Sequence, residues 1–292
     1  MASLIDLIAQ PLSHPFMVRG LVAALLVGVV CAILGTYVVL RGMAFLGDAL
    51  AHSILPGVAV GYLVGGGARG PLFWWAMGTG VVAALGIGAI ARRGEIKEDT
   101  AIGVIFAGML ALGVALISTA RSYSVDLAHF LFGDVLGVAA RDLVLTGVFG
   151  ALVLLIVFAF YKEFLVLSFD PILAATLRLP TRFFDYLLLV MLAVTVVISL
   201  QTVGVALMVA MLVTPGATAL LLTRRLPAMM AVSAGIGVLS AIAGLYLSYY
   251  ANVASGAAIV LVATALFGLA FLFAPGRGVL ARRLTERAHP PH

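Results

Sequence analysis

Charged residues are scarce in this chain of 292 residues, and their scarcity excludes an ordinary soluble domain. Only 10% of the residues are Asp, Glu, Lys or Arg, whereas 64% are hydrophobic and the mean hydropathy is +1.23. A soluble globular domain carries about 25% charged residues. The composition therefore predicts an all-α polytopic membrane protein. We expect one transmembrane domain over residues 1–275, followed by a basic tail over residues 276–292.

Cysteine and nucleotide-binding motifs are also nearly absent. The single cysteine, Cys31, cannot form a disulfide within the chain, and a thiolate metal site would need more cysteines. No glycine-rich segment is followed by Lys-Ser or Lys-Thr, which excludes that type of nucleotide-binding loop. The first residues, 1–15, contain two prolines and lack the long apolar core of a cleaved signal peptide.

Long apolar runs are what the chain has instead. A membrane-spanning helix needs about 20 predominantly apolar residues. The candidate spans are residues 18–40, 43–64, 71–91, 101–119, 143–160, 185–200, 204–222, 228–250 and 257–274. Only Gln201–Gly204 separates the sixth candidate from the seventh, so the sequence predicts nine spans and leaves eight as the alternative.

The basic residues are distributed unequally between the two sets of connections. One set carries 13 Lys and Arg residues and the other carries 4. Connections rich in Lys and Arg stay in the cytoplasm. This rule predicts a cytoplasmic C-terminus and, with nine spans, an external N-terminus. It also explains the net charge of +5 without a nucleic-acid partner.

Asp48 and His52 are the only acid and the only histidine within membrane-length apolar sequence. A charge near the bilayer centre costs about 2.5–3.5 kcal/mol on insertion scales, so such residues are usually functional. Residues four apart share one face of a helix. Pro56 has no N–H, which deprives the carbonyl of His52 of its helical donor. A carboxylate, an imidazole and a carbonyl suit manganese, zinc or iron. A proton path and a purely structural Asp–His pair are the alternatives.

A second proline lies inside a later candidate span. Pro215, in the segment Met208–Gly216, predicts a second broken helix, and paired broken helices recur at transporter binding sites. Met208 and Met211 precede this proline. We expect both methionines to pack in the core rather than to bind metal.

Two polar connections are long enough to carry structure. The outer connection, residues 120–142, mixes apolar and acidic residues and predicts short helices at the membrane interface. Its charged residues and histidine would catch cations at an external mouth, contact an external partner, or form a plain solvated loop. These residues are Arg121, Asp126, His129, Asp134 and Arg141.

The inner connection, residues 161–184, contains helix start and stop signals. Ser168 or Asp170 can cap a helix with Pro171 at its first position, and Pro180 is expected to end it. The pattern predicts a short cytoplasmic helix over residues 170–179, too short to span the membrane. Such a helix is a docking surface for a soluble partner.

Several of these segments together carry a family resemblance. The segments are residues 41–52, 55–59, 103–109, 131–136 and 201–217. Over roughly residues 16–275, the chain resembles the permease subunits of bacterial zinc, manganese and iron ABC importers. The Asp-Ala-Leu-Ala-His run from Asp48 to His52 is the specific part of this match, whereas the glycine matches alone are weak.

The resemblance implies a fold, a location and a set of partners. The fold would be that of cobalamin and siderophore importer permeases, in the bacterial cytoplasmic membrane and in contact with lipid. A second permease copy, two cytoplasmic ATPase subunits and an extracytoplasmic metal-binding protein would complete the complex. The ATPase would contact a coupling helix that carries Asp170, Pro171, Ala174, Ala175, Leu177 and Arg178.

The resemblance also implies a mechanism. Asp48 and His52 would lie in the translocation path of an imported divalent metal, with ATP hydrolysed by the partner and no permanently bound cofactor. The chain itself would not be an enzyme. A proton-coupled secondary transporter using the same pair is the alternative function, and an intramembrane enzyme would need more ligands or a nucleophile. The sequence does not choose among manganese, zinc and iron.

Overall fold

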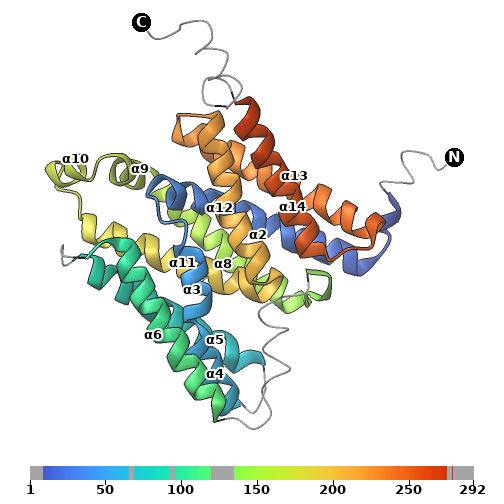
Figure 1. Ribbon diagram of the computed structural model, residues 1–292, viewed down its shortest axis with the longest axis horizontal. Helices are drawn as coiled ribbons and strands as arrows, with labels where there is room; N and C mark the ends of the chain where they lie inside the picture. The colour runs from blue at the N-terminus through green and yellow to red at the C-terminus, as the bar shows by residue number, and fades with distance from the viewer. Residues whose placement is uncertain (1–8, 66–68, 93–95, 120–134, 275–277, 279–292) are drawn as a thin grey trace, which may run out of the picture.

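The computed structural model describes residues 9–65, 69–92, 96–119, 135–274 and 278, and all its elements there are helices (Figure 1). The long helices are α2 (Pro15–Leu40), α5 (Arg69–Ala91), α6 (Glu98–Ser118), α8 (Ala140–Ala159), α11 (Thr181–Val203), α12 (Val205–Leu222), α13 (Leu226–Ala251) and α14 (Ser255–Phe273). The short ones are α3 (Leu46–Ser53), α4 (Leu55–Gly65), α9 (Tyr161–Phe169), α10 (Pro171–Thr176) and the 3₁₀ turn η1 (Val135–Gly137).

Nine segments of the described chain are long and apolar enough to cross a membrane, as predicted. The helices α3 and α4 together form one of them, Leu46–Gly65. The alternative of eight spans is excluded at Gly204, where α11 ends and α12 begins. Gly204 has φ +83°, a conformation that only glycine adopts at little cost. This single residue therefore separates two spans that the sequence left almost continuous.

The helix α2 lies at the centre of the bundle. It packs along α12 and α13 and also contacts α8 and α11 (Figure 1). Most of α2 is buried inside the protein, whereas most of α6 and α8 is not. The outward faces of α6 and α8 are therefore available to lipid or to another subunit.

Glycines allow α2 and α12 to approach closely. A Cβ atom added at Gly35 would lie 1.8 Å from the carbonyl oxygen of Leu212, and one added at Gly216 would lie 3.0 Å from the carbonyl oxygen of Gly35. Small residues at helix interfaces are the usual packing device in lipid. Gly35 and Gly216 therefore bring the backbones of α2 and α12 into direct contact at this crossing.

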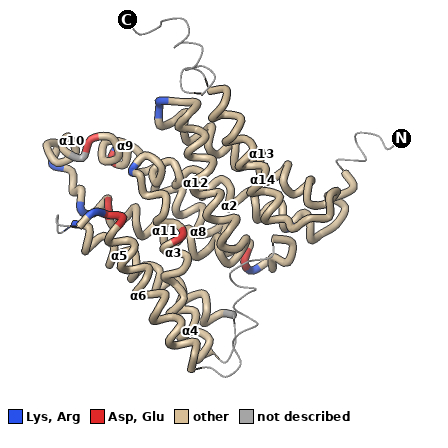
Figure 2. The backbone as a smooth tube through the Cα atoms, in the orientation of Figure 1, with Lys and Arg blue, Asp and Glu red and all other residues tan. Residues whose placement is uncertain are grey.

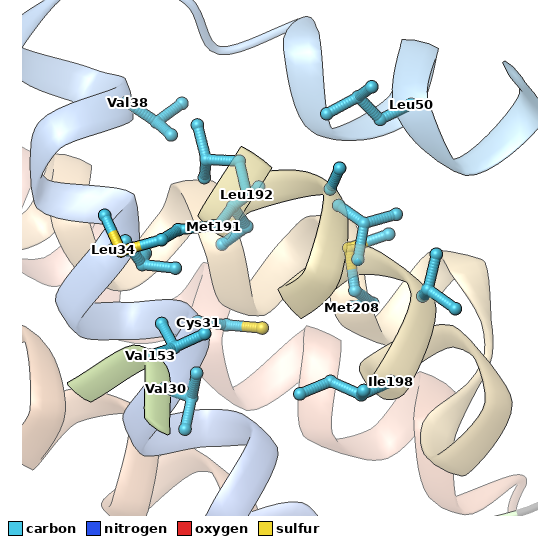
Figure 3. Packing of buried hydrophobic residues seen from close by; sticks show 14 of the residues in the cluster. Val30, Cys31, Leu34, Val38, Leu50, Val153, Met191, Leu192, Ile198 and Met208 are labelled. Carbon is cyan, nitrogen blue, oxygen red and sulfur yellow. The ribbon is translucent and has the colours of Figure 1, made fainter. Parts of the chain in front are cut away.

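The predicted break at Pro215 was wrong, because α12 continues from Val205 to Leu222 with Pro215 inside it. A membrane helix tolerates an internal proline where neighbouring helices compensate, and Pro215 is buried against the bundle. Met208 and Met211 are fully buried, which confirms their packing role. Figure 3 shows Met208 among aliphatic core side chains such as Leu192.

The short helix predicted over residues 170–179 exists as α10, but it is shorter than expected. Its N-terminus is capped as predicted, since Oδ1 of Asp170 accepts hydrogen bonds from the N–H groups of Ile172 (3.0 Å) and Leu173 (2.9 Å). The helix ends at Thr176 because Arg178 adopts φ +57°. Pro180 instead precedes α11. The helix α9, directly before α10, was not predicted.

Candidate metal site

A tight turn delivers the chain from α2 into α3. Gly42 has φ +72°, and the N–H of Met43 donates to the carbonyl of Val38 at 2.9 Å. The helix α3 then runs to Ser53 and is interrupted at Ile54, just before Pro56. The interruption predicted from Pro56 is confirmed. The carbonyl of His52 is not fully free, however, because it accepts the N–H of Ile54 and keeps only one lone pair for a further partner.

Asp48 and His52 lie on one face of α3, as their spacing predicts. The His52 Nδ1 atom is 3.6 Å from Oδ1 of Asp48 and 3.0 Å from the backbone oxygen of Asp48. Their side chains are 30% (His52) and 36% (Asp48) exposed, whereas most other residues of α3 are buried. The helix thus presents one polar, accessible face within an apolar environment.

The hydrogen bond to the backbone fixes the tautomer of His52. A carbonyl oxygen can only accept, so Nδ1 of His52 must carry the proton that it donates to the carbonyl of Asp48. In the neutral imidazole this leaves a lone pair on Nε2, the form in which histidine binds metals. The side chains of Asp48 and His52 therefore offer a carboxylate and a ring nitrogen.

Aromatic side chains fix the position of the imidazole. The ring of Phe106, from α6, meets the His52 ring edge-on at 5.8 Å between centroids, and the ring of Phe45 meets Phe106 at 5.9 Å. The helix α3 also packs against α5, α11 and α12. Movement of these surrounding helices would change access to the pair.

The pair alone cannot fill the coordination sphere of a metal ion. The described part of the chain contains no cluster of three or more His, Cys, Asp or Glu side chains arranged to hold a metal. Water, backbone oxygens or another subunit would have to supply the other ligands. Few protein ligands suit a transit site, which must release its ion.

The structure describes some of the other predicted site residues but not all of them. Arg141 is exposed at the start of α8, and the six coupling residues lie in α10 or flank it. Arg121, Asp126, His129 and Asp134 lie outside the described residues. Sequence reasoning missed one polar cluster, formed by Arg41, Arg92 and Asp185. Each of these residues lies at the edge of a span, where charged residues are common. The sequence alone does not show that these three edges lie together in the fold.

A family model now decides the class of protein. The model of the "ABC 3 transport family" matches residues 13–274. This chain belongs to that family. The permease is 48% identical to the "Manganese transport system membrane protein MntC" of Halalkalibacterium halodurans over 97% of this chain and 95% of that protein. It is 36% identical to the "Chelated iron transport system membrane protein YfeD" of Yersinia pestis over 99% and 97% of the two chains.

A solved structure shares the fold of the permease. "PsaBC from Streptococcus pneumoniae in complex with Fab" superposes with a TM-score of 0.81 at 39% identity, covering 97% of this chain and 99% of that one. The permease is therefore a multi-pass, all-helical subunit of a metal ABC transporter. As a permease subunit, it is not the ATPase.

Proposed function

We propose that the permease imports a divalent transition metal, manganese in the first place, through a path that includes Asp48 and His52. This proposal rests on the accessible pair Asp48 and His52 on an interrupted span. The chain keeps no other acid or histidine within membrane-length apolar sequence. Energy comes from separate ATPase subunits, because the chain has no nucleotide-binding loop of the glycine-rich type.

The chemistry of the donors and the names of relatives favour manganese. Carboxylate and carbonyl oxygens suit Mn²⁺, and imidazole is a common additional ligand. One relative is named for manganese transport and another for chelated iron transport. Iron is therefore the second candidate, since the same oxygen and nitrogen donors accept Fe²⁺.

The distribution of charge supports an orientation and a docking site for the ATPase. Basic residues are concentrated on the side of the molecule where α10 lies (Figure 2), which is the cytoplasmic side by the positive-inside rule. On α10 and its C-cap, Ile172, Leu173 and Leu177 are apolar and exposed, Ile172 by 80%. Apolar side chains exposed outside the bilayer mark an interaction surface.

Two further partners, a second permease copy and an external metal-binding protein, are assigned to different faces of the molecule. A second permease copy would face Asp48 and His52 and supply ligands that one chain lacks. An extracytoplasmic metal-binding protein would dock on the side of Arg141, at the start of α8. The tail over residues 276–292 would stay in the cytoplasm.

Replacing Ile172 with aspartate should weaken binding of the ATPase subunit by about tenfold or more, because loss of an apolar anchor at an interface centre costs about 2 kcal/mol. Co-purification and titration of the ATPase against the permease in detergent would measure this. Val253→Asp is the matched control, since Val253 is also apolar and exposed but lies between α13 and α14, at the opposite end. Equal binding by both variants would contradict the docking site.

Proteoliposomes separate the proposed ABC importer from a proton-coupled transporter. The permease, reconstituted with its ATPase and binding protein, should accumulate Mn²⁺ only when ATP is present on the side of α10. A pH gradient without ATP should drive no uptake, and a proton ionophore should not slow ATP-driven uptake. Uptake driven by the gradient alone would instead identify a secondary transporter.

A further inference from the structure

Three charged side chains from three helices meet at the end of the bundle near α10. Asp185 lies near the start of α11, Arg41 caps the end of α2, and Arg92 follows α5. Arg41 Nη1 donates to Oδ1 of Asp185 at 2.9 Å, and Nη2 of Arg92 donates to Oδ2. Each carboxylate oxygen therefore holds one arginine from a different helix. Figure 2 shows acidic and basic residues gathered between α5 and the α9–α10 pair.

The three side chains are partly buried, so salt screens their charges less than it screens a surface ion pair. The side chain of Arg41 is 14% exposed, that of Arg92 26% and that of Asp185 30%. Nε and Nη2 of Arg41 are buried and have no hydrogen-bond partner among the described residues. Arg92 also stacks over the ring of Tyr186 at 5.4 Å. Without Asp185, the guanidinium of Arg41 would lose the one charged partner it has among the described residues, and it would face that of Arg92.

The cluster lies between the proposed ATPase contact, α10, and the turn that leads into α3. Asp185 belongs to the helix that directly follows α10 and its C-cap. Arg41 begins the turn that leads into α3, which carries Asp48 and His52. Any displacement of the start of α11 must therefore move Arg41 and Arg92 with it or break their hydrogen bonds.

Aromatic packing also holds α9 against α2 and α11, beside the Arg41–Asp185–Arg92 cluster. The ring of Tyr37, on the last turns of α2, lies 5.7 Å from that of Phe164 on α9, and Phe164 lies 5.7 Å from Phe184 on α11. Phe184 directly precedes Asp185 in the sequence. The cytoplasmic helices thus cannot shift as a unit without pressing on α2 and α11 beside the ion pairs.

We propose that Asp185 is a positioning residue that couples movement of α10 to the turn before α3 and to the end of α5. This inference rests on the proposed function, because α10 is taken as the ATPase contact. The carboxylate of Asp185 holds both arginines in the resting arrangement. When the ATPase displaces α10, the start of α11 carries Arg41 and Arg92 with it, and the segment bearing Asp48 and His52 is repositioned. Without the carboxylate, only the aromatic contacts join these elements, and the site follows the movement of α10 incompletely.

The test compares transport with ATP hydrolysis in proteoliposomes that contain the permease, its ATPase and its binding protein. Asp185→Asn should leave ATP hydrolysis within about twofold of wild type and reduce the number of Mn²⁺ ions transported per ATP by about tenfold, within the usual range of coupling between sites. Asp185→Glu, which retains the carboxylate, should recover most of the ratio. Arg92→Gln should lower it in the same direction. Asp99→Asn, the same change at an exposed residue in the first turn of α6, should leave it unchanged.

The ratio distinguishes positioning from simple loss of structure. A folding defect would lower transport and hydrolysis together, and in that case the Arg92→Gln variant, which leaves the bond between Arg41 and Asp185 in place, decides the question. A normal ratio in Asp185→Asn and Arg92→Gln would overturn the proposed role of Asp185. Absence of ATP-driven Mn²⁺ uptake by the wild-type complex would instead contradict the proposed function, whatever the variants do.

Discussion

Cells that depend on this permease for manganese should lose uptake by at least about 100-fold when Asp48 is replaced by alanine. Loss of a group that merely orients a metal ligand typically costs about 10–100-fold, and Asp48 is proposed to be a ligand itself. The carboxylate is also the only charge that can offset a divalent cation on this face of α3. Uptake of radioactive manganese, normalised to the amount of permease in the membrane, would measure the effect.

His52→Ala should show a similar loss, and His52→Gln a smaller one, because glutamine offers an amide oxygen in place of Nε2. His14→Ala and Asp99→Asn are the matched controls, since both residues lie at span edges far from α3 in the sequence. Normal uptake by Asp48→Ala or His52→Ala at normal protein levels would remove these residues from the path and leave them as a structural pair.

Replacing Gly35 with alanine should prevent correct assembly of the bundle. The added Cβ would lie 1.8 Å from the backbone carbonyl oxygen of Leu212, and a backbone atom cannot rotate away as a side chain can. Overpacking a core usually costs about 1–3 kcal/mol, so we expect about 3 kcal/mol or more here. Because α2 is the central helix, the damage should reach α12 and α13 as well.

Thermal unfolding in detergent and the yield of monodisperse protein would show this loss. Gly147→Ala in α8 is the control, because nothing lies within 4 Å of a Cβ added there. If Gly35→Ala were as stable as Gly147→Ala, the contact between α2 and α12 would have to be looser than the structure shows.

The sequence predicted the spans well because their signal is local. Apolar length and hydropathy are properties of each segment alone, and they yielded nine spans within a few residues of the helices observed. The separation of α11 from α12 depended on a single glycine with positive φ, which composition alone cannot decide. For the same reason the length of α10 was overestimated, since Arg178 ends the helix by a left-handed conformation that arginine rarely adopts.

Pro56 and Pro215 show that the local sequence does not decide whether a proline interrupts a helix. Pro56 interrupts its helix and Pro215 does not, although both lie within apolar spans. Pro215 is buried where α12 packs closely on α2, so tertiary contacts hold the helix together. Pro56 is buried as well, yet the chain breaks at Ile54, so burial of the proline alone does not decide whether its helix is interrupted.

The candidate site was predictable in its residues but not in its geometry. Asp48 and His52 stand out because the surrounding sequence is apolar. The tautomer of His52 depends on a hydrogen bond to the backbone of Asp48, which the structure alone reveals. The cluster around Asp185 was not predictable, because its members are separated by up to 144 positions in the sequence.

The most direct test of the central claim is the rate of ATP-driven Mn²⁺ accumulation in proteoliposomes that contain the wild-type or the Asp48→Asn permease with its ATPase and binding protein. The wild-type complex should accumulate Mn²⁺, and the Asp48→Asn complex should hydrolyse ATP but accumulate at least about 100-fold less, because the change removes the only charge on α3 that can offset the cation. Equal accumulation by the two complexes would contradict a metal path through Asp48 and His52.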